Sequence, residues 1–242
     1  MSGLTIQSPG QKTSKLVELM RNLAGTRGGT GVGFRPQTGP RKRVTALVAS
    51  FAAGDTDGVM AAKGAGVDAL EIRIAGEKDM RGLADLIARV GMPVGVSMPA
   101  TADATAAAAA ADARADWVRL PLDASIATME WEKPGRLLTV PFELDLDLAH
   151  GLNGLNIEAI LIDQAVEMPE EFSYRDALRL GAIRELIKKP LLLHAGPGLP
   201  PSAAAASEHL GADALVVYAA GARSTETLAA YIAALEHRAA KA

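Results

Sequence analysis

The chain has 242 residues, of which 49% are hydrophobic and 22% charged, with a formal net charge of −3 and no cysteine. A single (β/α)8 domain is typically ~250 residues long, and such a chain can bury a large core without help from disulfides or metal. The lack of cysteine excludes a disulfide framework, thiolate metal ligands and a cysteine nucleophile, and the charge balance gives no reason to expect a nucleic-acid partner.

No apolar run reaches the ~18 residues of a membrane span, and the N-terminus lacks a signal-peptide pattern. We therefore expect a soluble, cytoplasmic protein. Within it, residues 1–42 are predicted to form a short helix and a flexible Gly-rich arm, and residues 43–242 a (β/α)8 barrel.

The first predicted element is a helix over residues 14–24, where Ser14 is placed to cap an apolar stripe. In a barrel, a leading helix often closes the bottom. Residues 25–36 are Gly-rich and are predicted to be a linker, with a loop folding over a ligand as the alternative. The arm is also basic, so an acidic partner is a second alternative to a solvated tail. As a solvated tail, residues 1–35 would be dispensable for the barrel.

Four short segments repeat one pattern, in which an acidic residue opens an apolar run. These acids are Asp68, Asp116, Glu158 and Asp213. Their spacing of roughly 45–55 residues is typical of a repeated unit containing two strands and two helices. Four further apolar runs lie between the repeats, so the two sets together predict eight strands.

The predicted strands alternate with helices along the whole chain. We predict strands over residues 43–51, 68–74, 92–98, 116–122, 136–144, 157–164, 190–195 and 213–218. We predict helices over 55–64, 77–90, 101–115, 146–152, 174–188, 201–211 and 224–238, with residues 123–134 irregular. Such alternation indicates a parallel sheet, and eight units favour closure. The predicted fold class is therefore α/β, a single TIM barrel.

Alternation within the strands predicts which side chains face the barrel axis. If the more apolar phase of each strand faces the helices, the other phase places polar groups near the carboxyl ends. This set is Glu71, Arg73, Gly95, Ser97, Arg119, Thr139, Pro141, Glu143, Asp163, His194 and Tyr218. Barrel enzymes keep their active sites at these ends, which favours a polar site. The alternative is an internal salt-bridge network that pairs Glu71 with Arg119 and Arg73 with Asp163.

The loops after the seventh and eighth predicted strands contain the residues expected of an anion site. Gly196, Gly198 and Gly221 would allow the backbone to approach a phosphate, and Arg223 and Ser224 could contact it directly. Barrels often bind phosphate here, through backbone N–H groups and a helix N-terminus. The alternative is that these glycines only make tight turns.

Two resemblances to known families follow from these residues. Glu71 and Arg73, as Glu-x-Arg after a Gly-x-Asp opening, look like type I 3-dehydroquinate dehydratase, in which the equivalent pair binds the substrate's hydroxyl and carboxylate groups. Where that family has a Schiff-base Lys and a His, this sequence has Asp163 and Glu143. The ends of strands 7 and 8 resemble the phosphate-binding barrels of tryptophan, histidine and thiamine biosynthesis.

We expect a lyase or isomerase that acts on a small phosphorylated or carboxylated metabolite by proton transfer. Glu71, Asp163 and His194 are the acid/base candidates, and Arg73 and Arg119 would hold a carboxylate. Ser97, Glu143 and Tyr218 would complete the substrate site. We expect neither nucleic acid nor a membrane as a partner and leave self-association open.

Two alternatives remain open at this point. Glu71, Glu143, Asp163 and His194 could instead bind Mg²⁺ or Mn²⁺, as in class II-type aldolases, so the cofactor is either none or a divalent metal. Because no Lys lies at a predicted strand end, the barrel could also be a non-catalytic binding or scaffold subunit.

Overall fold

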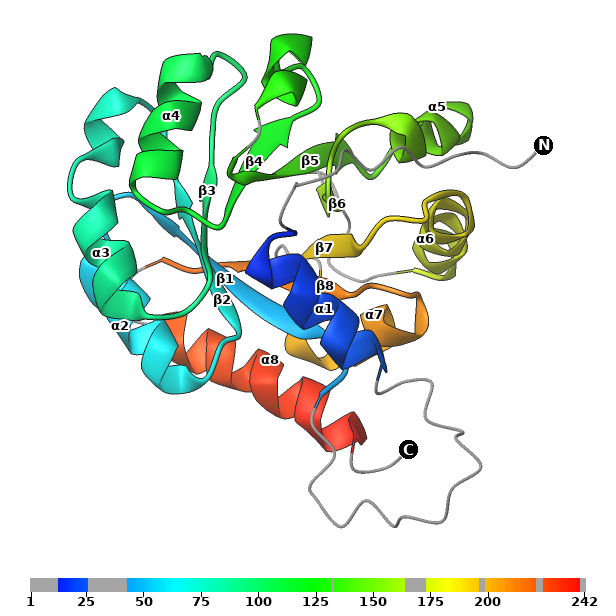
Figure 1. Cartoon of the computed structure of the whole chain (residues 1–242). Helices are drawn as coiled ribbons and strands as arrows, with labels where there is room; N and C mark the ends of the chain where they lie inside the picture. Colours follow the sequence, from blue (N-terminus) through cyan, green and yellow to red (C-terminus); the bar gives the residue numbers. More distant parts are fainter. Residues whose placement is uncertain are drawn as a thin grey trace.

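Eight parallel strands, one from each predicted apolar run, close into a barrel in chain order (Figure 1). The computed structural model describes residues 13–25, 43–131, 133–163, 173–195, 199–220 and 224–239. The strands are β1 (Ala46–Ala52), β2 (Ala69–Arg73), β3 (Val94–Ser97), β4 (Trp117–Pro121), β5 (Gly135–Pro141), β6 (Ala159–Asp163), β7 (Leu191–Ala195) and β8 (Ala214–Tyr218). The prediction of a single (β/α)8 barrel is confirmed.

Helices surround the strands. They are α1 (Lys15–Gly25), α2 (Thr56–Ala65), α3 (Leu83–Val90), α4 (Ala104–Asp112), α5 (Leu146–Gly151), α6 (Tyr174–Leu186), α7 (Pro201–His209) and α8 (Ser224–Ala239), with 3-10 turns η1 (Glu77–Met80), η2 (Ile126–Glu130) and η3 (Leu152–Gly154). Side-chain caps fix several starts, for example the Ser173–Asp176 capping box of α6. Across the described ranges, we find no helix with both the length and the apolar character of a membrane span.

Two predicted elements have different bounds in the structure. The helix expected over 77–90 is divided, because Gly82 adopts a left-handed φ of 75° and separates η1 from α3. The strand expected over 136–144 ends at Pro141, so Glu143 lies in the turn that follows β5. The predicted irregular segment contains the short turn η2.

The predicted inward and outward faces of the strands are confirmed in the N-terminal half of the barrel. There, alternate residues form an inner apolar cluster that is separate from the core between strands and helices. Trp117 is the largest fully buried side chain of this cluster. Gly95 on the adjacent β3 makes room for it, because a Cβ on Gly95 would lie 1.9 Å from Cε2 of Trp117. The interior below the carboxyl ends is therefore packed, as expected for a barrel of this class.

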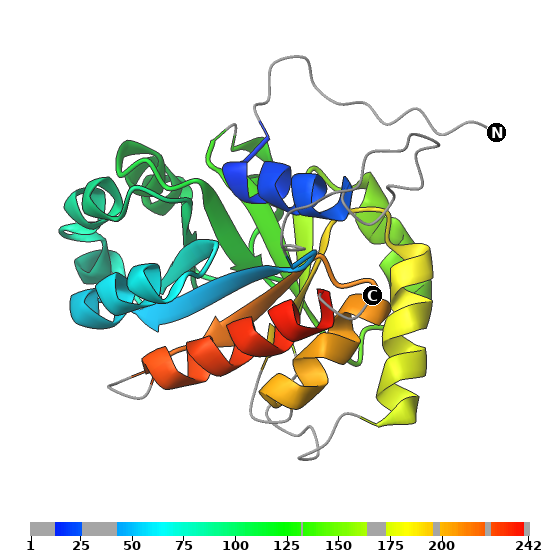
Figure 2. The same cartoon turned by 90° about the horizontal axis from the view of Figure 1, so that it is seen from below.

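Helix α1 closes the N-terminal end of the barrel, as predicted (Figures 1 and 2). Leu16, Val17 and Met20 insert into the inner cluster and are almost completely buried. The backbone N–H groups of Lys15 and Leu16 donate to Asp116, both at 2.9 Å. This carboxylate lies at the start of β4 and caps the positive end of α1.

The other repeated acids act at the same end of the barrel. Glu158 accepts from the backbone N–H of Ser14 at 3.1 Å. Asp68 accepts from the N–H of Leu47 at 2.7 Å, and Asp213 accepts from that of Leu191 at 2.9 Å. The acid that opens each repeat therefore binds backbone donors at the end of the barrel opposite the expected site.

Candidate active site

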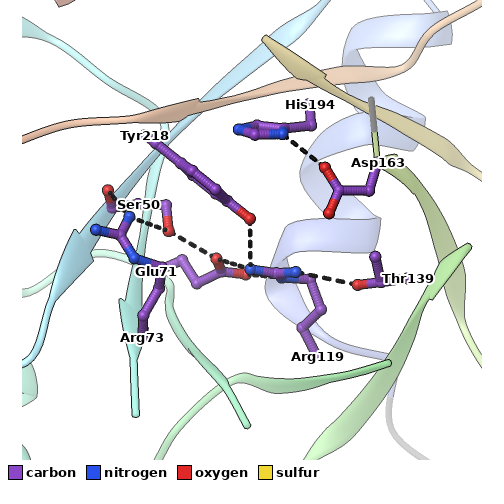
Figure 3. A network of polar contacts seen from close by, with 8 residues as sticks. All are labelled: Ser50, Glu71, Arg73, Arg119, Thr139, Asp163, His194 and Tyr218. Carbon is purple, nitrogen blue, oxygen red and sulfur yellow. Dashed lines mark hydrogen bonds and ion pairs between the residues drawn. The ribbon is translucent and has the colours of Figure 1, made fainter. Parts of the chain in front are cut away.

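A buried ion pair joins β2 to β4 at the carboxyl ends of the strands (Figure 3). Arg119 Nε donates to Glu71 Oε2 at 2.8 Å, and Arg119 Nη2 donates to Oε1 at 2.9 Å. Both side chains are buried. The Ser50 hydroxyl of β1 also donates to Glu71 Oε1, at 2.8 Å. This bidentate pair is the one that the salt-bridge alternative predicts.

Each member of the pair stabilises the charged form of the other. Burial would raise the pKa of Glu71, but Arg119, Ser50 and the nearby charge of Arg73 outweigh burial and hold the pKa below its ordinary value. Burial would likewise lower the pKa of Arg119, and the carboxylate of Glu71 raises it instead. Both groups therefore stay charged at neutral pH, and both oxygens of Glu71 already accept hydrogen bonds.

Arg73 lies beside this pair but is held differently. Its Nη1 donates to the backbone oxygen of Ser50 at 2.7 Å and to the Ser50 hydroxyl at 3.2 Å. Its guanidinium carbon lies 4.7 Å from the centroid of the Tyr218 ring, within cation–π range. The pairing of Arg73 with Asp163 that the salt-bridge alternative proposed is not formed, because Asp163 binds His194.

His194 of β7 and Asp163 of β6 form a second pair. Their Nδ1 and Oδ1 atoms are 2.7 Å apart. His194 is only 6% exposed, and its Nε2 is buried without a hydrogen-bond partner among the described residues. Since a carboxylate only accepts hydrogen bonds, we assign the Nδ1 proton to this contact. In the neutral ring, Nε2 then carries a free lone pair, and Figure 3 shows it on the side of the ring away from Asp163.

Tyr218 of β8 lies between the two groups (Figure 3). Its ring centroid is 3.7 Å from that of His194, and its hydroxyl oxygen accepts from Arg119 Nη2 at 3.3 Å. Burial raises the pKa of Tyr218, and the positive charge of Arg119 offsets part of that rise. The phenol is therefore neutral at physiological pH and keeps its proton available for a further acceptor.

The remaining predicted residues have different placements. Ser97 lies in register with Arg73 and Arg119, at the same level of the barrel. Ser224 begins α8 and is buried. Glu143 is not brought to the cluster, because its side chain is 78% exposed and pairs with Arg179 of α6 at 3.5 Å. The expected anion-binding residues Gly196, Gly198, Gly221 and Arg223 lie outside the described residues.

Sequence reasoning missed Ser50, which connects Glu71 to Arg73. The signal was present, since Ala46, Val48 and Ser50 alternate along β1 as the inward residues of other strands do. Thr139 of β5 was placed inward correctly, and its hydroxyl accepts from Arg119 Nη1 at 3.0 Å. Ser50 and Thr139 thus fix the two arginines from neighbouring strands.

The four predicted metal ligands do not converge. Glu71 is occupied by Arg119 and Ser50, Glu143 lies on the surface, and Asp163 with His194 makes only a pair. Over the described ranges, no group of three or more His, Asp or Glu side chains is placed to hold a metal ion.

The fold and this cluster define a parallel (β/α)8 barrel with a polar mouth. No family model matches the sequence, and no curated protein is significantly similar to it. Solved structures of this class are similar: Mycobacterium tuberculosis tryptophan synthase superposes with a TM-score of 0.65 at 15% identity, covering 95% of this chain and 98% of that one. A variant of the Pyrococcus furiosus tryptophan synthase alpha-subunit gives 0.64 at 11% identity, covering 79% and 96%. These likenesses confirm the barrel.

Proposed function

We propose that the protein is an enzyme, a lyase or isomerase that transfers a proton on a small anionic metabolite at the carboxyl end of the barrel. The observation that carries this proposal is His194, which has Nδ1 fixed by Asp163 and a buried Nε2 with no partner among the described residues. A buried polar atom without a partner costs free energy, and a catalytic role is one explanation for keeping such an atom. A substrate proton would supply the missing partner.

In this mechanism His194 Nε2 is the general base. Asp163 keeps the Nδ1 proton in place, so the lone pair at Nε2 is available, and it stabilises the imidazolium that forms when His194 accepts a proton. The same nitrogen can return the proton to another substrate atom, which completes an isomerisation or assists departure of a leaving group. Asp163 is therefore a positioning residue in this scheme.

Arg73 is the proposed anion-binding group. Among the described residues, its hydrogen bonds are made by Nη1 to Ser50, so the rest of the guanidinium can bind a carboxylate or phosphate. The neutral phenol of Tyr218 is a further donor. We also propose that Gly196, Gly198, Gly221, Arg223 and Ser224 contribute to the anion site. Glu71 and Arg119, which the sequence offered as a catalytic and a binding group, are proposed to hold the site in shape.

The structural neighbours support catalysis over a scaffold role. Tryptophan synthase is an enzyme built on the same barrel, although identities of 11–15% carry no substrate across. The metal-dependent alternative is not favoured by the arrangement of Glu71 and Glu143. The proposed steps use protein groups alone, so chelation of divalent metal should leave them unchanged.

Solvent exchange tests the proposal without knowledge of the product. Small phosphorylated sugars and cyclic carboxylates are screened by thermal shift, and each binder is incubated with the protein in D2O while its C–H signals are followed by NMR. We expect deuterium incorporation with the wild type and at least about a hundredfold slower exchange with His194→Gln, since general base catalysis contributes 10²–10⁴-fold. His150→Gln, on the exposed end of α5, is the matched control.

A bound metabolite that exchanges equally with both proteins would refute the role of His194. A bound metabolite that exchanges with neither protein would favour the scaffold alternative.

A further inference from the structure

The outward face of α6 carries an apolar stripe. Tyr174 is 92% exposed and Leu178 is 76% exposed, whereas Leu180 and Ile183 on the opposite face are buried in the core. The stripe borders a surface groove of roughly 410 Å³ that also touches Leu210, after α7. Tyr174 and Leu178 lie one helical turn apart, so the two exposed side chains form one apolar patch.

The stripe has large side chains at one end of the helix face and small ones at the other. Tyr174 and Leu178 protrude from its first half, and Gly181 and Ala182 leave a hollow in its second half. A Cβ added at Gly181 would meet no heavy atom within 4 Å, so no side chain of the described residues fills that hollow. The hollow is therefore open to a side chain from outside.

We propose that this stripe is the interface of a homodimer in which two copies of α6 pack antiparallel about a two-fold axis. In such a pair, residues equally far from the midpoint of the stripe, which lies between Arg179 and Leu180, are at the same level along the two helices. Leu178 then lies opposite Gly181 of the second copy. An antiparallel pairing can be drawn for any helix with one apolar face. Here the side-chain sizes are also complementary, because the large Leu178 faces the small Gly181.

Charge and hydrogen bonding favour the same arrangement. Tyr174 lies opposite Glu185 of the second copy, so the phenol can donate to that carboxylate. The exposed Arg175 is next to Tyr174, which brings a positive charge near the same carboxylate. Each contact occurs twice by symmetry, and no like charges meet within the stripe.

The expected dimer is weak. A single helix face buries less than the ~1,200–2,000 Å² that is typical of stable interfaces, so we expect dissociation in the micromolar range. The proposal is independent of the catalytic one, since the stripe contains no group of the mouth of the barrel.

Gly181→Gln provides the test. The substitution fills the hollow, so it should raise the dissociation constant by about tenfold or more in sedimentation equilibrium. Because Gln is a better helix former than Gly, the monomer should be no less stable. The control is Gly64→Gln on α2, an exposed helical glycine that also has open space around it. It should gain helix stability and still dimerise.

A charge exchange checks the geometry separately. Glu185→Arg alone should weaken the dimer, and combining it with Arg175→Glu should restore it. A wild type that stays monomeric from micromolar to millimolar concentration would overturn the proposal. So would a dimer that Gly181→Gln leaves intact, since its interface would then lie elsewhere.

Discussion

Arg73 and Arg119 face the same space, yet their surroundings give them different roles. Arg119 is buried and donates to Glu71, Thr139 and Tyr218, which leaves little of it for a ligand. Arg73 is half-buried, and within the described part of the chain it donates through one nitrogen to Ser50. A guanidinium with free donors at the mouth is suited to a ligand, whereas a saturated one is suited to holding the barrel together.

Arg73→Ala is therefore expected to weaken anion binding with little effect on the fold. Loss of a charged hydrogen bond of ~1.5–3 kcal/mol corresponds to a roughly ten- to hundredfold weaker affinity. Calorimetric titration with a metabolite identified by the exchange screen measures the affinity, and thermal unfolding measures the fold. Arg89→Ala, an exposed arginine on α3, controls for the loss of charge. Unchanged binding with a large drop in melting temperature would favour the internal salt-bridge network.

Glu71→Gln is expected to act mainly on stability. It leaves the buried Arg119 without its counter-ion, which costs about 3–5 kcal/mol in comparable pairs. The pH dependence should change as well. Because the folded pKa of Glu71 is below its ordinary value of 4.5, the carboxylate stabilises the fold above that pH and loses this contribution as the pH falls through the folded pKa.

Urea unfolding at a series of acidic pH values measures this effect. The wild type should lose stability over that window more steeply than Glu71→Gln. Asp116 works in the opposite direction, since burial raises its pKa, but it is present in both proteins and cancels in the comparison. Parallel curves for the two proteins would contradict the assigned role of Glu71.

Strand alternation predicted most inward residues of the site, because a parallel strand fixes the face of each side chain. It could not predict which inward residues touch. The ring of His194 on the adjacent β7 binds Asp163, so the contact with Arg73 that the salt-bridge alternative proposed does not form. Glu143 had the correct alternation but lies beyond Pro141, where β5 ends and alternation no longer applies.

At the scale of elements, α1 belongs to the barrel rather than to a separable arm. Its amphipathic pattern and its position were predictable from residues 14–24. Its insertion into the inner cluster was not, because that depends on Asp116 and Glu158, about a hundred or more residues away in sequence. That residues 1–35 are dispensable stays a prediction, and the packing of α1 argues against it, because deleting α1 would expose the inner cluster.

Leu16→Ala tests the contribution of α1. Leu16 is fully buried in the inner cluster, so truncation is expected to cost about 2–5 kcal/mol of unfolding free energy. Glu18→Ala, on the exposed side of the same helix, should change stability by less than about 0.5 kcal/mol. Urea unfolding compares the two variants. Equal and small effects would show that α1 is not required for the packing of the barrel.

For the whole molecule, the periodic pattern was more informative than residue identity. Four acidic openings and eight apolar runs predicted the barrel, which superposes on tryptophan synthase structures at 11–15% identity. Burying apolar runs in register requires hydrophobic residues of suitable size at alternate positions, and many sequences satisfy that condition. The chemistry depends on single side chains at the strand ends, so a shared fold leaves the substrate open.

The position of the repeated acids has a practical consequence for protein engineering. Each even-numbered strand has a carboxylate before its first residue that binds backbone N–H groups, and the groups of the mouth lie at the other end of the barrel. A library that randomises positions 73, 97, 194 and 218 would leave the four acids and α1 untouched. New catalytic or binding activities could then be selected on this barrel while the contacts that hold its N-terminal end stay unchanged.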